Sequence, residues 1–295
     1  QFYGLMESLA LWAALGVLWF LYRYVNEKRV GAFLMANVLY FAVCFIHERY
    51  MALLPLLLMA VVLGFGKGLA SETVTVEPER NSEPDRAAKP GRSRGRGQSR
   101  GAQNKKETAV RTAATEKKAD SRFPKSLLFV ITLFVFGAIQ MIRLYTIGTL
   151  SPAGTGGTDV ADTFKFTDAI GQALNQVGLV FGRNSGPLHL CIEPFADSPD
   201  RIKNLILAAE AILGVGVLAA VIGMIRARDE IVCHLKNAVL FLVFITLCIG
   251  SSSVTIRVEM RWVYVAYAAA LLFFAYLSRV MGKAGILVLL YGCLI

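Results

Sequence analysis

Two arginines and a carboxylate stand close together at the start of an apolar run near the end of the sequence. They are Arg257, Glu259 and Arg261, and Trp262 opens the apolar run. In an extended segment all three side chains point to one side, and in a helix Arg257 and Arg261 share a face. Two guanidinium groups can then bind one phosphate, since arginine is a planar donor that stays charged. The alternative is a structural salt bridge at a helix start.

A second polar cluster, His47-Glu48-Arg49, separates two apolar runs earlier in the sequence. Such residues are costly at a membrane boundary unless they line a cavity or pair with each other. We therefore expect Glu48 and Arg49 either to help hold a phosphate or to form an ordinary turn between helices. His47 beside a carboxylate could act as a base. No second ligand stands at metal spacing, so we expect no metal at these residues.

A third candidate group lies on a turn marked by two glycines and a proline. Arg183, Asn184 and His189 supply hydrogen-bonding groups there. Facing the helix ends, such groups could contact sugar hydroxyls or an acceptor; an ordinary loop is the alternative. The five cysteines have no ligand spacing and mostly lie in apolar runs, so we interpret them as packing residues. No cofactor is predicted.

The elements that must position these residues are apolar helices. Of 295 residues, 55% are hydrophobic and 18% are charged, which is typical of a membrane protein and not of a soluble one. We predict an all-α, polytopic transmembrane helix bundle of about seven or eight spans, several of them shorter than a straight span requires. The apolar runs are 9–24, 32–46, 51–65, 127–142, 205–225, 231–249, 262–277 and 284–295.

A basic segment divides these runs into two groups. Residues 71–125 contain fourteen Lys or Arg against eight Asp or Glu, and they lack Leu, Ile, Tyr, Trp and Cys. So few apolar side chains cannot offset the entropy of ordering, which predicts a disordered basic cytoplasmic linker. The alternative is a tether for RNA or anionic lipid; we expect no nucleic-acid partner. The predicted domains are thus helices in 1–70, the linker 71–125, and helices in 126–295.

Basic residues at alternate turns predict which ends of the helices face the cytoplasm. That topology puts Arg49, the loop 145–203 and the segment 257–261 together on the extracytoplasmic face. Within the loop, residues 163–180 approximate the stripe of an amphipathic helix. Such a helix is expected to lie against the outer leaflet or against the tops of the spanning helices.

Two segments carry a resemblance to a known group of enzymes. Residues 46–55 and 258–264 resemble the Glu-x-Arg-aromatic motifs that open late spans in polytopic glycosyltransferases of the GT-C superfamily. Residues 179–190 look like part of the C-terminal half of such bacterial proteins. The resemblance implies transfer of a sugar from a polyprenyl-phosphate donor to a cell-envelope glycan, lipid or protein, at the outer face of the cytoplasmic membrane.

The resemblance also implies roles for particular residues. Arg257, Glu259 and Arg261, with Glu48 and Arg49, would hold the lipid-linked phosphate. The family's catalytic acid normally follows its first span, and no acidic pair does so here. Because the sequence begins with Gln and ends inside an apolar run, we expect a fragment whose catalytic acid precedes its first residue.

Two other functions stay open at this point. The chain could be a transporter or flippase for an anionic lipid or glycan precursor, with Glu210 as an ionisable residue one turn into a span. It could also be a structural membrane subunit whose basic linker binds a cytoplasmic partner. In every case membrane lipids are expected to surround it.

Overall fold

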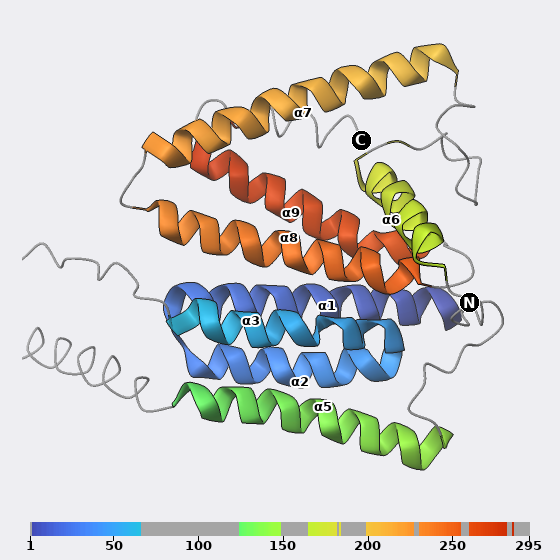
Figure 1. Cartoon of the computed structure of the whole chain (residues 1–295), viewed down its shortest axis with the longest axis vertical. Coiled ribbons are helices and arrows are strands. Elements are labelled where there is room, and N and C mark those ends of the chain that lie inside the picture. The colour runs from blue at the N-terminus through green and yellow to red at the C-terminus, as the bar shows by residue number, and fades with distance from the viewer. Residues whose placement is uncertain are drawn as a thin grey trace, which may run out of the picture. The chain divides into compact units, whose positions relative to one another are not determined.

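The computed structural model describes residues 2–65, 124–148, 165–181, 183, 199–226, 230–254, 260–281 and 285. Every regular element in those ranges is a helix, and none is a strand, so the predicted all-α class is confirmed (Figure 1). The elements are α1 (Phe2–Glu27), α2 (Val30–Ile46), the 3-10 helix η1 (Glu48–Leu53), α3 (Leu54–Phe65), α5 (Lys125–Ile147), α6 (Phe166–Val180), α7 (Asp200–Arg226), α8 (Ile231–Ser253), the 3-10 helix η4 (Met260–Val263) and α9 (Tyr264–Met281).

Four of these helices are long and apolar enough to cross a bilayer. They are α1, counted from Leu5, with α5, α7 and α8. Helices α2 and α9 are apolar but shorter. The composition and these helices together make the chain a membrane protein. The apolar run predicted at 284–295 and the linker predicted at 71–125 fall outside the described residues, apart from Pro124, Lys125 and Gly285.

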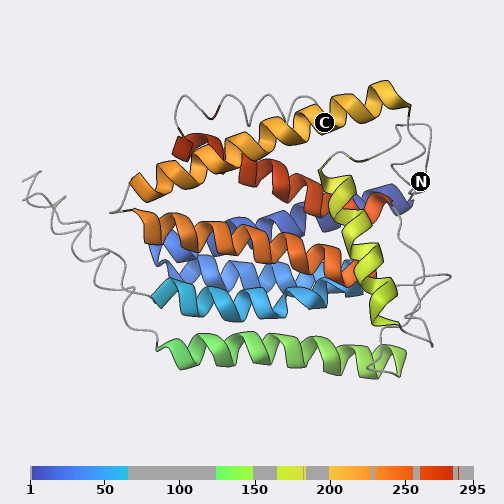
Figure 2. The ribbon, with the colours of Figure 1, turned by 45° about the horizontal axis from the view of Figure 1, so that its top comes forward.

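The helices on both sides of the predicted linker pack into one compact unit, formed by Gln1–Gly66 with Lys125–Ile295. Helix α1 packs against α2 and α3, and α5 packs against α2 and α3. On the other side of α1 lies α8, followed by α9 and then α7, as both views of the ribbon show (Figures 1 and 2). Small side chains help α1 and α2 to approach, since Ala10, Ala14 and Ala36 are fully buried.

One end of the bundle, which we call the Arg29 end, contains the turn between α1 and α2. Lys28 in this turn has a φ of 60°, and its Nζ donates a hydrogen bond to the carbonyl of Gly64. A Cβ added to Gly64 would lie 2.5 Å from a ring carbon of Tyr24, so any larger residue would force the buried Tyr24 ring to move. The turn is thereby tied to the end of α3.

The opposite end, which we call the Arg49 end, gathers the short elements. Here η1 and η4 both contact α8, and α6 contacts α8 and η4. Helix α6 crosses this end of the bundle at a steep angle to α8 (Figure 2). Because consecutive helices alternate in direction, η1 and η4, which are distant in the sequence, are brought to the same end.

Candidate anion site

Arg49, in the first turn of η1, is the centre of a buried polar cluster. Its Nη2 atom donates a hydrogen bond to Oε2 of Glu7 at 3.1 Å and lies 3.3 Å from the hydroxyl of Tyr50. The Arg49 side chain is only 12% exposed. Glu7 stands near the start of α1, so the ion pair joins α1 to the turn between α2 and α3.

Two aromatic rings enclose the same guanidinium group. Its central carbon lies 5.1 Å from the ring centroid of Tyr50 and 5.8 Å from that of Trp262 in η4. Trp262 is 6% exposed. Aromatic faces attract a cation, most strongly where water is excluded. The arginine is therefore held by side chains from α1, η1 and η4.

One donor group of Arg49 is left over by these contacts. The Nη1 atom is buried and has no hydrogen-bond partner among the residues that the structure describes. A buried donor without a partner is destabilising, particularly on a charged group. An anion at Nη1 would supply that partner, and a phosphate oxygen has the right charge and geometry.

His47 shares Glu7 with Arg49. Its Nε2 atom lies 3.2 Å from Oε1 of Glu7, while Arg49 is bound to Oε2. The backbone of His47 is extended and ends α2, with its N–H bound to the carbonyl of Val43. The two atoms are within ion-pair distance, but Nε2 has no hydrogen bond of good geometry among the described residues. Nδ1 is the other ring nitrogen, the one we consider for proton transfer.

Glu48 pairs with a different arginine, Arg143. Nη2 of Arg143 in α5 donates to Oε2 of Glu48 at 2.9 Å, and Nη1 of Arg143 lies 3.3 Å from the sulfur of Met51. Arg143 is only 4% exposed. This second ion pair attaches α5 to η1, so Glu48 positions the turn that carries Arg49.

Tyr50 supplies a neutral polar group beside Arg49. Its hydroxyl lies 3.3 Å from Nη2 of Arg49 and adds no competing negative charge.

The predicted amphipathic helix lies over this end as α6, where it is attached to α8. Gln176 is fully buried; its Nε2 donates to Oγ of Ser253 at 3.0 Å, and its Oε1 accepts from the hydroxyl of Ser252. Of the two partners expected for this helix, the tops of the spanning helices are thus in contact with it. Phe166, Ile170 and Leu174 remain exposed on the other side.

The other predicted site residues are described unequally. Arg257, Glu259, Asn184 and His189 lie outside the described residues, as does the side chain of Arg261, whose backbone belongs to η4. Arg183 follows the end of α6 and binds Glu210 of α7 through two hydrogen bonds. Of the predicted phosphate-binding residues, Arg49 is the one whose guanidinium group is enclosed by described side chains from α1, η1 and η4.

Sequence reasoning missed Glu7 and did not assign Arg143 to the site. Each had a signal: Glu7 is a carboxylate at the start of an apolar run, and Arg143 follows Gln140 near the end of another. Within the described ranges, no three His, Cys, Asp or Glu side chains are grouped to hold a metal. Comparison with protein-family models, curated proteins and solved structures gives no match.

Proposed function

We propose that the chain is a membrane glycosyltransferase that takes a sugar from a polyprenyl-phosphate donor and passes it to a cell-envelope glycan, lipid or protein. The observation that carries the proposal is Arg49. Its guanidinium is buried at one end of a helix bundle, held by Glu7 and two aromatic rings, with Nη1 left without a described partner. Such a group suits the phosphate of a donor whose lipid tail remains in the bilayer.

The orientation of the chain in this proposal follows from charge. The segment 71–125, with its excess of basic residues, joins α3 to α5 at the Arg29 end, which favours the cytoplasm for that end. The Arg49 end then faces outward. Helices α1, α2, α3, α5, α7, α8 and α9 each make a pass, with η1 and η4 extending the short helices α3 and α9, in the cytoplasmic membrane.

The reaction divides the work between Arg49 and His47. The acceptor hydroxyl oxygen forms a bond to the anomeric carbon of the donor sugar, and the bond from that carbon to the phosphate oxygen breaks. Its electron pair goes to the phosphate, whose developing charge Arg49 stabilises in a site where water is scarce. The hydroxyl proton passes to Nδ1 of His47, while Glu7 keeps the imidazole and the guanidinium in place.

The described contacts support the transporter alternative less well than they support sugar transfer. It depended on Glu210 as an ionisable residue within a span, but both carboxylate oxygens of Glu210 accept hydrogen bonds from Arg183. A carboxylate whose two oxygens are both bound to an arginine is less available to bind a transported proton or ion. Glycosyl transfer uses the buried arginine directly, and we prefer it for that reason.

The proposal is tested by substituting Arg49 and assaying sugar transfer in isolated membranes. Radiolabelled polyprenyl-phosphate hexoses serve as donors, and incorporation into glycan, lipid and protein fractions is measured. We expect Arg49→Ala to lower the rate about 100- to 1000-fold, the range for loss of one group that stabilises developing charge. Arg49→Lys keeps the positive charge but lacks the planar guanidinium group. Its transfer rate should therefore lie between the rates of the wild type and of Arg49→Ala.

A matched control is available at the Arg29 end. Arg23 also binds a glutamate through two hydrogen bonds, to Glu27 one turn away. Arg23→Ala should therefore remove an arginine–glutamate pair without affecting transfer. Undiminished transfer by Arg49→Ala at normal expression, or no transfer by the wild-type chain with any donor, would overturn the proposal.

A further inference from the structure

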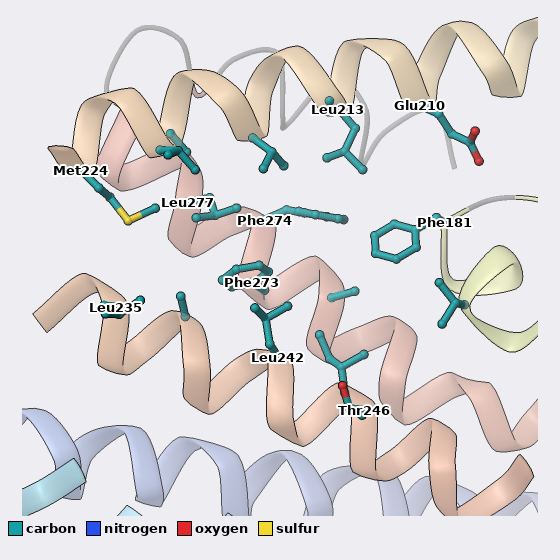
Figure 3. Close-up of a pocket in the computed structure, with 18 of the residues that line it drawn as sticks. Phe181, Glu210, Leu213, Met224, Leu235, Leu242, Thr246, Phe273, Phe274 and Leu277 are labelled. Atoms are coloured by element: carbon teal, nitrogen blue, oxygen red, sulfur yellow. The ribbon is translucent and has the colours of Figure 1, made fainter. Parts of the chain in front are cut away.

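A cavity of about 890 Å³ lies between α7 and the pair α8 and α9 (Figure 3). Leu213 of α7, Leu235 and Leu242 of α8, and Phe273 and Phe274 of α9 point into it. Phe181, at the end of α6, lies at one end of the cavity. Among the described lining residues, Glu210 and Thr246 are the ones with polar side chains.

The cavity is open to the surroundings of the bundle. Leu235 is 60% exposed and Leu242 is 51% exposed, although both line it. An apolar space of this kind does not hold water well and takes up hydrocarbon instead. Since α7 and α8 are both long enough to cross a bilayer, the hydrocarbon that reaches the opening is a lipid chain.

A pair of opposite charges stands at one end of the cavity. Nε and Nη2 of Arg183 donate to Glu210 at 2.6 and 3.0 Å, and Glu210 lines the cavity itself. The Arg183 side chain is half exposed, so the pair is accessible to a ligand. Arg183 follows the end of α6, which crosses the Arg49 end of the bundle, and Glu210 is the eleventh residue of α7. The pair therefore stands at the end of the cavity nearest the Arg49 end, the side from which a lipid head group would reach it.

We propose that this cavity binds one phospholipid with a zwitterionic, primary-amine head group. Its chain lies between α7 and α8, its phosphate contacts the guanidinium of Arg183, and its ammonium contacts the carboxylate of Glu210. A cation and an anion side by side match a head group that carries both charges, and they match an anionic head group less well. The site uses none of Arg49, His47 and Glu7, the side chains that have a role in the proposed sugar transfer, and it does not depend on that proposal.

Gly214 allows the cavity to be filled without disturbing the fold. It lines the cavity, and a Cβ added to it would meet nothing within 4 Å. The chain is reconstituted in nanodiscs with equal parts of phosphatidylethanolamine and phosphatidylglycerol, and retained lipids are identified by native mass spectrometry. We expect wild type to retain one phosphatidylethanolamine, and Gly214→Phe to lower the lipid-bound fraction about tenfold, equivalent to about 1.4 kcal/mol.

The control is Leu218→Phe, which adds an aromatic ring to an exposed position of α7 outside the cavity. It should retain lipid like the wild type. Arg183→Gln should keep a bound lipid but lose the preference for phosphatidylethanolamine. Equal retention of both lipids by wild type overturns the head-group assignment. Unchanged retention by Gly214→Phe, or a dimer in place of a lipid-bound monomer, overturns the site.

Discussion

Arg49 and Trp262 lie in contact, with the guanidinium carbon 5.8 Å from the centroid of the indole ring. They come from two short 3-10 helices that follow different long helices and meet over the end of α8. The contact joins η1 to η4. It also means that the environment of Arg49 depends on the packing of η4.

Replacing Trp262 tests this contact. Trp262→Ala should weaken donor binding by about 1–2 kcal/mol, the value of a largely desolvated cation–π contact. The apparent KM for the lipid-linked donor should therefore rise about fivefold to thirtyfold, with a smaller effect on kcat. Trp12, which is exposed on α1, is the control, and Trp12→Ala should leave KM unchanged. An equal rise in both variants would contradict the specific contact.

Glu7 is predicted to stabilise the Arg49 end as well as to orient the site. Glu7→Gln leaves a buried guanidinium without its carboxylate, so the free energy of unfolding should fall by about 3 kcal/mol. Thermal unfolding in detergent measures the effect. Glu27→Gln breaks an arginine pair of the same kind at the Arg29 end, where solvent screens the charges, and should have a much smaller effect on unfolding. Similar losses in the two variants would argue against a special role for Glu7.

The ion pair between Glu48 and Arg143 can be measured by a double-mutant cycle. Glu48→Gln and Arg143→Gln should each destabilise the chain, and the double variant should lose less than the sum. We expect a coupling free energy of about 1–3 kcal/mol, because Arg143 is almost completely buried. Additive losses would show that the two side chains do not interact in the membrane. If sugar transfer falls in step with stability, Glu48 acts only by positioning η1.

Gly64 provides a test of the close approach between α1 and α3. Gly64→Ala places a methyl group against the ring of Tyr24, so the free energy of unfolding should fall by about 1–3 kcal/mol. Gly137 of α5 has open space where a Cβ would lie, and Gly137→Ala should stabilise its helix by up to about 1 kcal/mol. Unfolding in detergent distinguishes the two. Stabilisation by both changes would contradict the described packing of Tyr24.

Hydropathy alone was enough to predict the helical class and the position of most helices. Apolar runs at 9–24, 127–142 and 231–249 all lie within described helices, because the need to satisfy backbone groups in a bilayer leaves few alternatives. The two polar clusters were recognisable too, since charged residues that interrupt apolar runs are rare. These signals are local in the sequence, and so they can be identified without coordinates.

The partners of the polar residues were decided by the tertiary structure. Glu48 stands next to Arg49 in the sequence but pairs with Arg143, while Arg49 pairs with Glu7. Which charges meet depends on the rotation of each helix about its axis and on which helices are neighbours, and neither has a local signal in uniformly apolar helices. The same holds for the cavity beside α7. The sequence therefore determined a membrane helix bundle with arginines at its ends, and the packing determined which arginine has a site around it.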